Sequence, residues 1–115
     1  TDLLRGGEMT KRSLFKSGAR DLNEGEILAL LNARNVRFVM LRPGDGADLL
    51  VMISPMELWE VKNPDQPESK RLLTQEERIT MAYCLETGIP YHVIETVDDA
   101  LYRLNLYFSR HESAV

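Results

Sequence analysis

The order of its helix and strand signals predicts that this chain of 115 residues is an α/β domain. Helix-capping signatures precede three segments whose apolar residues recur at helical spacing. Short apolar runs lie between those segments, and proline and glycine turn signals separate the runs from one another. The predicted order is helix, three strands, helix, strand, helix.

The first predicted helix begins at Asn23, in the run Asn23-Glu24-Gly25-Glu26. Asparagine is a favoured N-cap residue, and a glutamate three positions later completes a capping box. Asn35 is a plausible left-handed residue to end the helix. Its core-facing stripe is predicted to be Ile27, Leu28, Leu30 and Leu31.

Three strands are predicted over residues 36–41, 48–53 and 58–62. Pro43-Gly44-Asp45-Gly46 is a strong turn signal between the first two, and a second turn is expected over residues 54–57. The near-continuous apolar run of the second strand favours a buried strand. The polar, proline-containing residues 63–71 predict a loop.

A second capping box, Thr74-Gln75-Glu76-Glu77, predicts the next helix, which Gly88 and Pro90 end. A strand is expected over residues 91–95. Thr96-Val97-Asp98-Asp99 then caps a last helix with Leu101, Leu104 and Phe108 at helical spacing. The residues of the middle helix expected to be available for burial are Ile79, Met81, Ala82 and Leu85.

The chain is predicted to form one domain over residues 22–110, with a basic arm at 1–21 and a tail at 111–115. A short helix is expected around residues 11–16. Cys84, the single cysteine, permits no disulfide within the chain and is expected to be a buried small apolar residue. A reducing, cytoplasmic location is the default for such a sequence. No apolar run approaches the length of a membrane span.

The formal net charge is −4, but the charge is unevenly distributed. Residues 1–42 hold eight Lys or Arg against five Asp or Glu, whereas the remaining residues hold six against thirteen. An acidic total argues only weakly against a nucleic-acid partner, because phosphate contacts need local positive charge. A bound cation would also offset an acidic active site.

Three charged residues interrupt the apolar strands: Asp48 opens the second, and Glu60 and Lys62 lie in the third. Because side chains alternate along a strand, Glu60 and Lys62 point to one face while Trp59 and Val61 point to the other. Two carboxylates and a lysine on adjacent strands form a set suited to metal-dependent phosphodiester hydrolysis. The alternative is an exposed strand face for Glu60 and Lys62, with Asp48 as a turn acceptor.

The element order, together with Gly46-Ala47-Asp48 and Glu60-Val61-Lys62, resembles the PD-(D/E)XK nuclease superfamily, over residues 23–104. Within it the chain is most similar to VRR-NUC domains and archaeal-type Holliday junction resolvases. Gly88-Ile89-Pro90 before the last strand also fits this resemblance. Ala47 departs from it, because VRR-NUC domains usually have proline there. The resemblance implies a restriction-endonuclease-like α-β-β-β-α-β core with a mixed sheet flanked by helices.

By this resemblance, Asp48, Glu60 and the backbone carbonyl of Val61 would bind Mg²⁺ or Mn²⁺. Lys62 would orient the attacking water or stabilise the transition state. Glu24 would reach the metal from the first helix, although first-turn acids are also favoured by the helix dipole and Glu26 could take its role. Gln75 would point toward the site from the middle helix, unless it is only a solvated first-turn residue.

The resemblance implies hydrolysis of DNA phosphodiester bonds. Some members of the family act as homodimers that cut branched DNA, so a structure-selective homodimer is one expected form. The chain could also be a part of a larger repair, phage or restriction protein. The last helix, which has apolar residues on more than one side, could pair two copies or simply pack on its own sheet. A catalytically inactive module of the same fold, binding nucleic acid or a protein, is the alternative. The residues expected to contact phosphates, unless they form an ordinary solvated surface, are Lys11, Arg12, Lys16, Arg20, Arg37, Arg42, Lys70 and Arg71.

Overall fold

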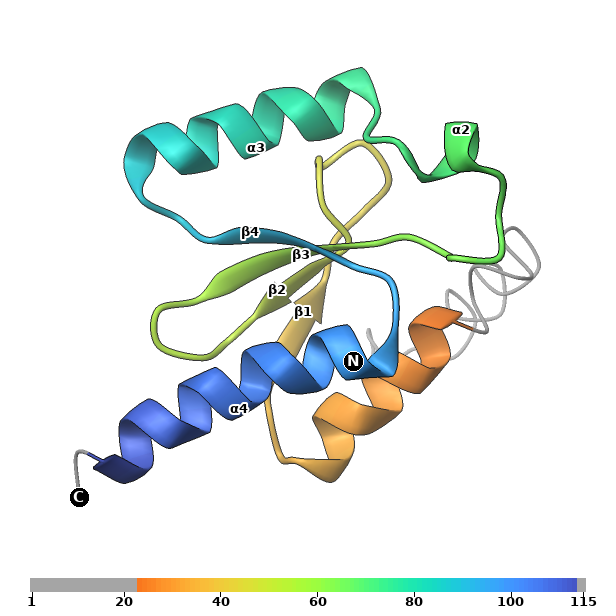
Figure 1. Cartoon of the computed structure of the whole chain (residues 1–115). Helices are drawn as coiled ribbons and strands as arrows, with labels where there is room; N and C mark the ends of the chain where they lie inside the picture. Colours follow the sequence, from red (N-terminus) through yellow and green to blue (C-terminus); the bar gives the residue numbers. More distant parts are fainter. Residues whose placement is uncertain (1–22, 114–115) are drawn as a thin grey trace.

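The structure is a computed structural model that describes the backbone of residues 23–113 and the side chains of residues 23–110. A mixed sheet lies between helices, with α3 (Gln75–Thr87) on one face. The helix of residues 23–33 and α4 (Val97–Ser113) cover the other face (Figure 1). The short helix predicted around residues 11–16 lies outside the described residues. Among the described helices, none is long and apolar enough to cross a membrane.

The sheet has four strands in the order β1 (Phe38–Met40), β2 (Leu49–Val51), β3 (Glu57–Val61) and β4 (Tyr91–Ile94). The first three pair antiparallel, and β4 is parallel to β3. The predicted α/β class and mixed sheet are therefore confirmed. Strands β1, β2 and β4 are shorter than predicted, whereas β3 has its predicted length but begins one residue earlier. The turn expected to reach residue 57 is therefore wrong, because Glu57 already pairs with Val51.

Parallel pairing of β3 and β4 requires a crossover connection, which the intervening helices provide. The predicted loop at residues 63–71 is wrong in part, because Glu68–Arg71 forms a short helix, α2. The predicted capping box of α3 is confirmed: Thr74 Oγ1 accepts a hydrogen bond from the Glu77 N–H, and the Glu77 carboxylate accepts one from the Thr74 N–H. Gly88 ends α3 in the left-handed conformation.

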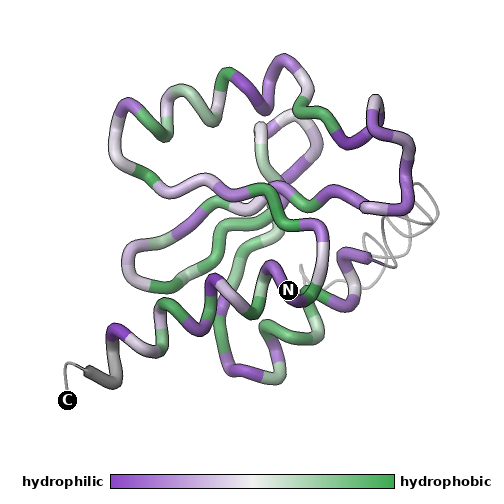
Figure 2. The backbone as a smooth tube through the Cα atoms, viewed as in Figure 1, coloured by the Kyte–Doolittle hydropathy of each residue, from purple (hydrophilic) through white to green (hydrophobic). Residues whose placement is uncertain are grey.

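The burial predicted for α3 is largely wrong. Ile79, Ala82 and Leu85 are exposed, and Cys84 is the buried apolar residue of the helix. Figure 2 shows why the sequence was ambiguous: hydrophobic and hydrophilic segments alternate along the whole of α3, so its pattern does not select one core-facing side. The helix therefore rests on the sheet through a narrow contact that includes Cys84 and Met81.

The main core lies on the opposite face, where alternation along the strands sends Trp59 and Val61 against the helix of residues 23–33 and α4. The predicted stripe residues Ile27 and Leu31 are fully buried there. Leu104 of α4 is also fully buried, so this helix packs on its own sheet, as the simpler reading of its apolar residues predicted. Helix α4 extends to Ser113, beyond the predicted start of the tail.

The loop between β1 and β2 rises from the sheet toward α3 (Figure 1). Gly46 has a φ of 89°, and a Cβ there would overlap the Thr80 side chain. The Tyr91 hydroxyl donates a hydrogen bond of 2.6 Å to the Gly46 carbonyl. Gly46 is thus required both for its backbone conformation and for the close approach of this loop to α3. The predicted left-handed conformation of Asn35 is also confirmed, with φ at 58°.

We expect Gly46→Ala to lower the free energy of unfolding by about 1–3 kcal/mol, because alanine is strained at this φ and overlaps Thr80. Urea denaturation followed by circular dichroism measures the change. Gly25→Ala is the matched control: it lies in the first helix with nothing within 4 Å of the place that an added Cβ would occupy, so it should be neutral or stabilising. Equal losses from both substitutions would contradict the assigned role of Gly46.

Candidate acidic active site

Asp48, Glu60 and Lys62 come together on the face of the sheet that α3 covers. The ladder pairs Leu49 with Trp59, and continuing it by one residue sets Asp48 opposite Glu60. Trp59 and Val61 belong to the main core on the other face, so Glu60 and Lys62 point toward α3, as the alternation predicted. The position of Asp48 at the entrance to β2 is set by its N–H, which donates to the Trp59 carbonyl at 2.9 Å.

The Asp48 carboxylate ends the pairing of β2 with β3. The N–H groups of Leu58 and Lys62 donate toward β4, so that of Val61 points toward β2. Its acceptor is not a backbone carbonyl but Oδ2 of Asp48, at 2.8 Å. This hydrogen bond joins two strands and is not a turn contact, and it fixes the Asp48 carboxylate beside the Val61 peptide.

Glu60 and Lys62 do not form the exposed strand face that was the alternative reading. The Glu60 side chain is 2% exposed and that of Lys62 is 11% exposed. Lys62 Nζ lies 3.3 Å from Oε2 of Glu60 and 3.0 Å from Oε1 of Glu77, the third residue of α3. The lysine therefore bridges a strand carboxylate and a helix carboxylate in the gap between the sheet and α3.

The electrostatics of the cluster are dominated by an excess of negative charge. Burial, the charge of Asp48, and the hydrogen bond and charge of Glu77 together raise the pKa of Glu60 to about 8, although the charge of Lys62 opposes the rise. Glu60 is therefore mainly protonated at neutral pH when no cation is bound. The protonated Glu60 carboxyl group donates a hydrogen bond to the Glu77 carboxylate.

Glu77 and Lys62 are held in their charged forms. Although burial opposes ionisation, the hydrogen bonds from the Thr74 backbone and from Lys62 lower the pKa of Glu77. Burial likewise opposes the charge on Lys62, but Glu77 and Glu60 raise its pKa. The main ion pair of the cluster at neutral pH is thus Lys62 with Glu77.

Glu77 is the member of this site that the sequence reading missed. Gln75, predicted to point toward the site, is exposed at the first position of α3. The signal for Glu77 was its place as the capping-box glutamate, which explained the residue without a further role. In the structure the same Oε1 accepts from both the Thr74 N–H and Lys62.

The start of the first helix adjoins the cluster. The Asn23 side-chain amide donates to the Lys62 carbonyl at 2.9 Å, which ties this helix to the end of β3. Glu24 is half-buried at this helix start, whereas Glu26 is exposed. Of the two acids considered for the metal, Glu24 therefore has the more enclosed position.

The suitability of these groups for a divalent cation depends on their donor atoms and their charge. Over residues 23–110, no group of three or more His, Cys, Asp or Glu side chains is placed to hold a metal ion. Asp48 and Glu60 nevertheless supply the hard oxygen donors that Mg²⁺ and Mn²⁺ prefer, on directly adjacent strands. With Glu60 ionised, three carboxylates against one lysine leave a charge of −2, which one divalent ion would neutralise. The donor chemistry and the charge both fit such an ion.

The structure describes only some of the predicted phosphate-binding residues. Lys11, Arg12, Lys16 and Arg20 lie outside the described residues. Arg42 is exposed and pairs with Asp45 in its own turn, with Nε 3.9 Å from Oδ2. Arg71 pairs with Glu95 at 3.5 Å and donates to the Gln66 carbonyl, whereas the neighbouring Lys70 is exposed in α2.

A second buried carboxylate, Glu57, lies on the opposite face of β3. It accepts hydrogen bonds from Trp59 Nε1 at 2.9 Å and from Arg103 Nη2 at 2.8 Å. Burial opposes its ionisation, but these hydrogen bonds and the Arg103 charge lower its pKa. Half-buried His92, whose Nε2 lies 3.9 Å from Oε1 of Glu57, is thus a sheet histidine beside this ion pair. Glu57 is satisfied by its own partners, in contrast to Glu60.

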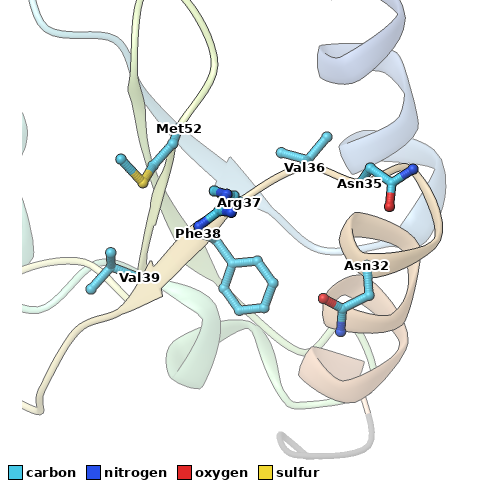
Figure 3. A pocket seen from close by; sticks show the side chains of 7 residues that line it. All are labelled: Asn32, Asn35, Val36, Arg37, Phe38, Val39 and Met52. Carbon is cyan, nitrogen blue, oxygen red and sulfur yellow. The ribbon is translucent and has the colours of Figure 1, made fainter. Parts of the chain in front are cut away.

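An open pocket of about 670 Å³ lies away from this cluster, between the end of the first helix and β1 (Figure 3). Asn32, Asn35 and Arg37 provide its polar groups, and Phe38 points from β1 toward the helix. Its lining includes no carboxylate, so this hollow and the acidic cluster are separate features.

Comparisons with protein-family models, with curated proteins and with solved structures find no match to this chain. Functional inference therefore depends on the geometry and charge of the cluster formed by Asp48, Glu60, Lys62 and Glu77.

Stability should depend on pH through Glu60. A folded-state pKa of about 8, above the ordinary 4.5, means that the folded protein binds a proton that the unfolded chain releases between these values. The free energy of unfolding should therefore fall as the pH rises from about 4.5 to about 8, by at most about 1.4 kcal/mol per pH unit. Glu60→Gln, which imitates the protonated acid, should remove this fall. Parallel urea titrations of both proteins measure it, and identical pH profiles would contradict the assignment.

Proposed function

We propose that this protein is a metal-dependent nuclease that hydrolyses DNA phosphodiester bonds. The observation that carries the proposal is the buried carboxylate Glu60, which faces Asp48 across adjacent strands and has too little positive charge around it. A buried acid with a strongly raised pKa beside other acids is a feature of functional sites, because a fold gains no stability from it. The element order and the Glu60-Val61-Lys62 motif point to the restriction-endonuclease-like core as the particular form of this α/β fold.

Asp48, Glu60 and the Val61 carbonyl would hold one Mg²⁺ or Mn²⁺, with Glu24 completing the set directly or through water. The Val61 peptide already adjoins the Asp48 carboxylate, since its N–H donates to Oδ2. When bound, such an ion lowers the pKa of a coordinated water and neutralises charge on the phosphate.

Lys62 would stabilise charge that develops on the scissile phosphate or orient the attacking water. Two carboxylates hold its ammonium group in place, so the Lys62 side chain loses little conformational entropy when the substrate binds. Glu77 acts through Lys62 and is a positioning residue. A cation between Asp48 and Glu60 would favour the ionised form of Glu60. Lys62 would then lie between two charged carboxylates, those of Glu60 and Glu77.

The proposed partner is DNA, bound by a homodimer. Exposed Lys70 and Arg42 lie on the described part of the chain, and the basic residues before residue 21 would add phosphate contacts. The rival function is a catalytically silent module of the same fold that binds nucleic acid or a protein. It predicts binding without cleavage, so the two proposals separate in the experiments below.

Metal binding should release a proton. Because Glu60 is protonated below pH 8, an ion bound by its carboxylate must displace about one proton at pH 6–7 and almost none at pH 9. Calorimetric titration with Mn²⁺ in two buffers of different ionisation enthalpy counts the protons. Asp48→Asn should abolish the binding heat. Glu57→Gln is the matched control, a buried carboxylate on the opposite face whose loss should leave Mn²⁺ binding intact. Binding without proton release would place the ion elsewhere.

Cleavage should require the same residues. With Mg²⁺ or Mn²⁺, the wild-type chain should cut at least one of linear, flapped and four-way DNA, measured by gel assay on labelled strands. Glu60→Gln and Lys62→Met should each lower the rate about 10²–10³-fold, since each removes charge stabilisation from the transition state. Circular dichroism and urea denaturation check the fold of both variants, because Lys62→Met nearly conserves the side-chain volume but leaves Glu77 without its buried partner.

Two results would reject the enzyme. If the wild type and Glu60→Gln are equally inert on every substrate while DNA binding persists, the silent module is correct. If cleavage by the wild type does not change when the divalent ion is chelated, the metal-dependent mechanism is wrong.

A further inference from the structure

Strand β1 is an edge of the sheet, because among the described strands only β2 pairs with it. The Arg37 carbonyl accepts a hydrogen bond from the Met52 N–H at 2.9 Å, and the Leu41 N–H donates to the Asp48 carbonyl at 2.8 Å. The two residues that flank β1 therefore direct these backbone groups toward β2. In an antiparallel ladder, residues directed to the partner strand alternate with residues directed away from it.

This alternation directs the N–H and C=O groups of Phe38 and Met40 out of the sheet. No hydrogen bond within the described part of the chain occupies these four groups. The strand also lacks the usual protection of an edge, since Phe38-Val39-Met40 contains no proline and no charged side chain. Strand β1 therefore offers two donors and two acceptors, at the spacing of a strand, to a further extended segment.

Side chains beside this edge line the open pocket between the first helix and β1 (Figure 3). Arg37 and Val39 are two residues apart, so their side chains lie on the same face of the sheet, and Met52 adjoins Arg37 through the ladder. Val39 is 45% exposed and Met52 is 48% exposed. Two apolar side chains and one cationic side chain therefore lie next to one another along the unpaired edge.

The charge of the pocket favours an acidic ligand. Arg37 is exposed, and none of the ion pairs within residues 23–110 includes it. Asn32 and Asn35 line the same hollow and add amide donors, while its lining has no carboxylate. A guanidinium group binds a carboxylate through charge-assisted hydrogen bonds, so the pocket is complementary to an acidic side chain.

We propose that β1 binds an extended segment of a partner protein, which adds to the sheet as a further strand. Its backbone pairs with the outward groups of Phe38 and Met40, an apolar side chain covers Val39, and a carboxylate pairs with Arg37. Since side chains on one face of a strand are two residues apart, the segment has apolar and acidic residues at alternate positions.

An extended peptide fits this edge better than a nucleic acid does. A DNA phosphate would pair with Arg37 alone. A peptide also occupies the four outward backbone groups and removes the exposed Val39 and Met52 side chains from water. In such complexes the backbone hydrogen bonds provide affinity, and the alternate side chains provide specificity.

Amide exchange tests the strand pairing. The probe is the peptide acetyl-Thr-Glu-Thr-Val-Thr-Glu-Thr-amide, whose symmetrical sequence presents the same side chains in either strand direction. In a nuclear magnetic resonance titration of the full chain, saturating peptide should slow hydrogen exchange of the Phe38 and Met40 N–H groups about tenfold or more, because each gains an acceptor. The Val39 N–H is directed to β2 and should change far less.

N-methylation of the peptide tests the same pairing from the side of the ligand. Only every second amide of a paired strand faces its neighbour. Methylating one alternate set of peptide amides should therefore abolish binding, whereas methylating the other set should leave the dissociation constant nearly unchanged.

Charge reversal tests the acidic preference. Arg37→Glu should weaken binding of the peptide about three- to tenfold, because an exposed ion pair is replaced by repulsion. A peptide with lysine in place of both glutamates should bind this variant better than it binds the wild type. Arg110→Glu, at an exposed position on α4 that does not line the pocket, is the matched control and should have no effect. Circular dichroism confirms that each variant is folded.

Several outcomes would overturn the proposal. Slow exchange of the Phe38 and Met40 amides without peptide would show that this chain or a second copy already covers the edge. Equal effects of the two methylated sets would exclude strand pairing. If Arg37→Glu weakens DNA binding in a gel-shift assay but leaves peptide binding unchanged, Arg37 is a phosphate contact. The peptide measurements use neither metal nor DNA, so failure of this partner site and failure of the nuclease are distinguishable.

Discussion

Burial of Lys62 between two glutamates is the interaction on which the candidate site depends. One glutamate comes from β3 and the other from the first turn of α3, so the lysine joins the sheet to the helix across an otherwise thin contact. Removing one member of a buried ion pair is costly, because the charge that remains has lost its water and its partner. The same lysine therefore maintains the spacing of α3 from the sheet and the geometry of the acidic groups.

The two faces of the sheet differ in their apolar packing and in their balance of charge. On the face of α4, Trp59, Val61 and Leu104 pack into a continuous core, and the one buried acid, Glu57, is fully matched by Arg103 and Trp59. On the face of α3, apolar packing is sparse and the acids outnumber the cations. Stability is concentrated on the first face, which leaves the second able to carry an arrangement that is electrostatically unfavourable at rest.

The sequence predicted the parts of the fold that local chemistry determines. The capping box at Thr74, the left-handed Asn35 and the orientation of Glu60 and Lys62 each follow from neighbouring residues, and each is present. Strand ends were less predictable, because pairing depends on the partner strand: β2 begins only after Asp48, whose side chain replaces a backbone acceptor. The burial of α3 was mispredicted for a related reason, since a helix with apolar residues all around gives no direction to its core.

Glu77 shows a different limit of sequence-based prediction, because one residue holds two roles. This has a consequence for the interpretation of mutations at that position. One carboxylate oxygen completes the helix cap with Thr74 and accepts from Lys62, so a replacement that removes this oxygen removes a folding contact and a site contact together. A survey of variants by abundance alone would classify this position as structural, and one by activity alone would classify it as catalytic. Both roles depend on the same oxygen, so Glu77 should be among the least tolerant positions of the domain, although the flanking Gln75, Glu76 and Arg78 are exposed to water.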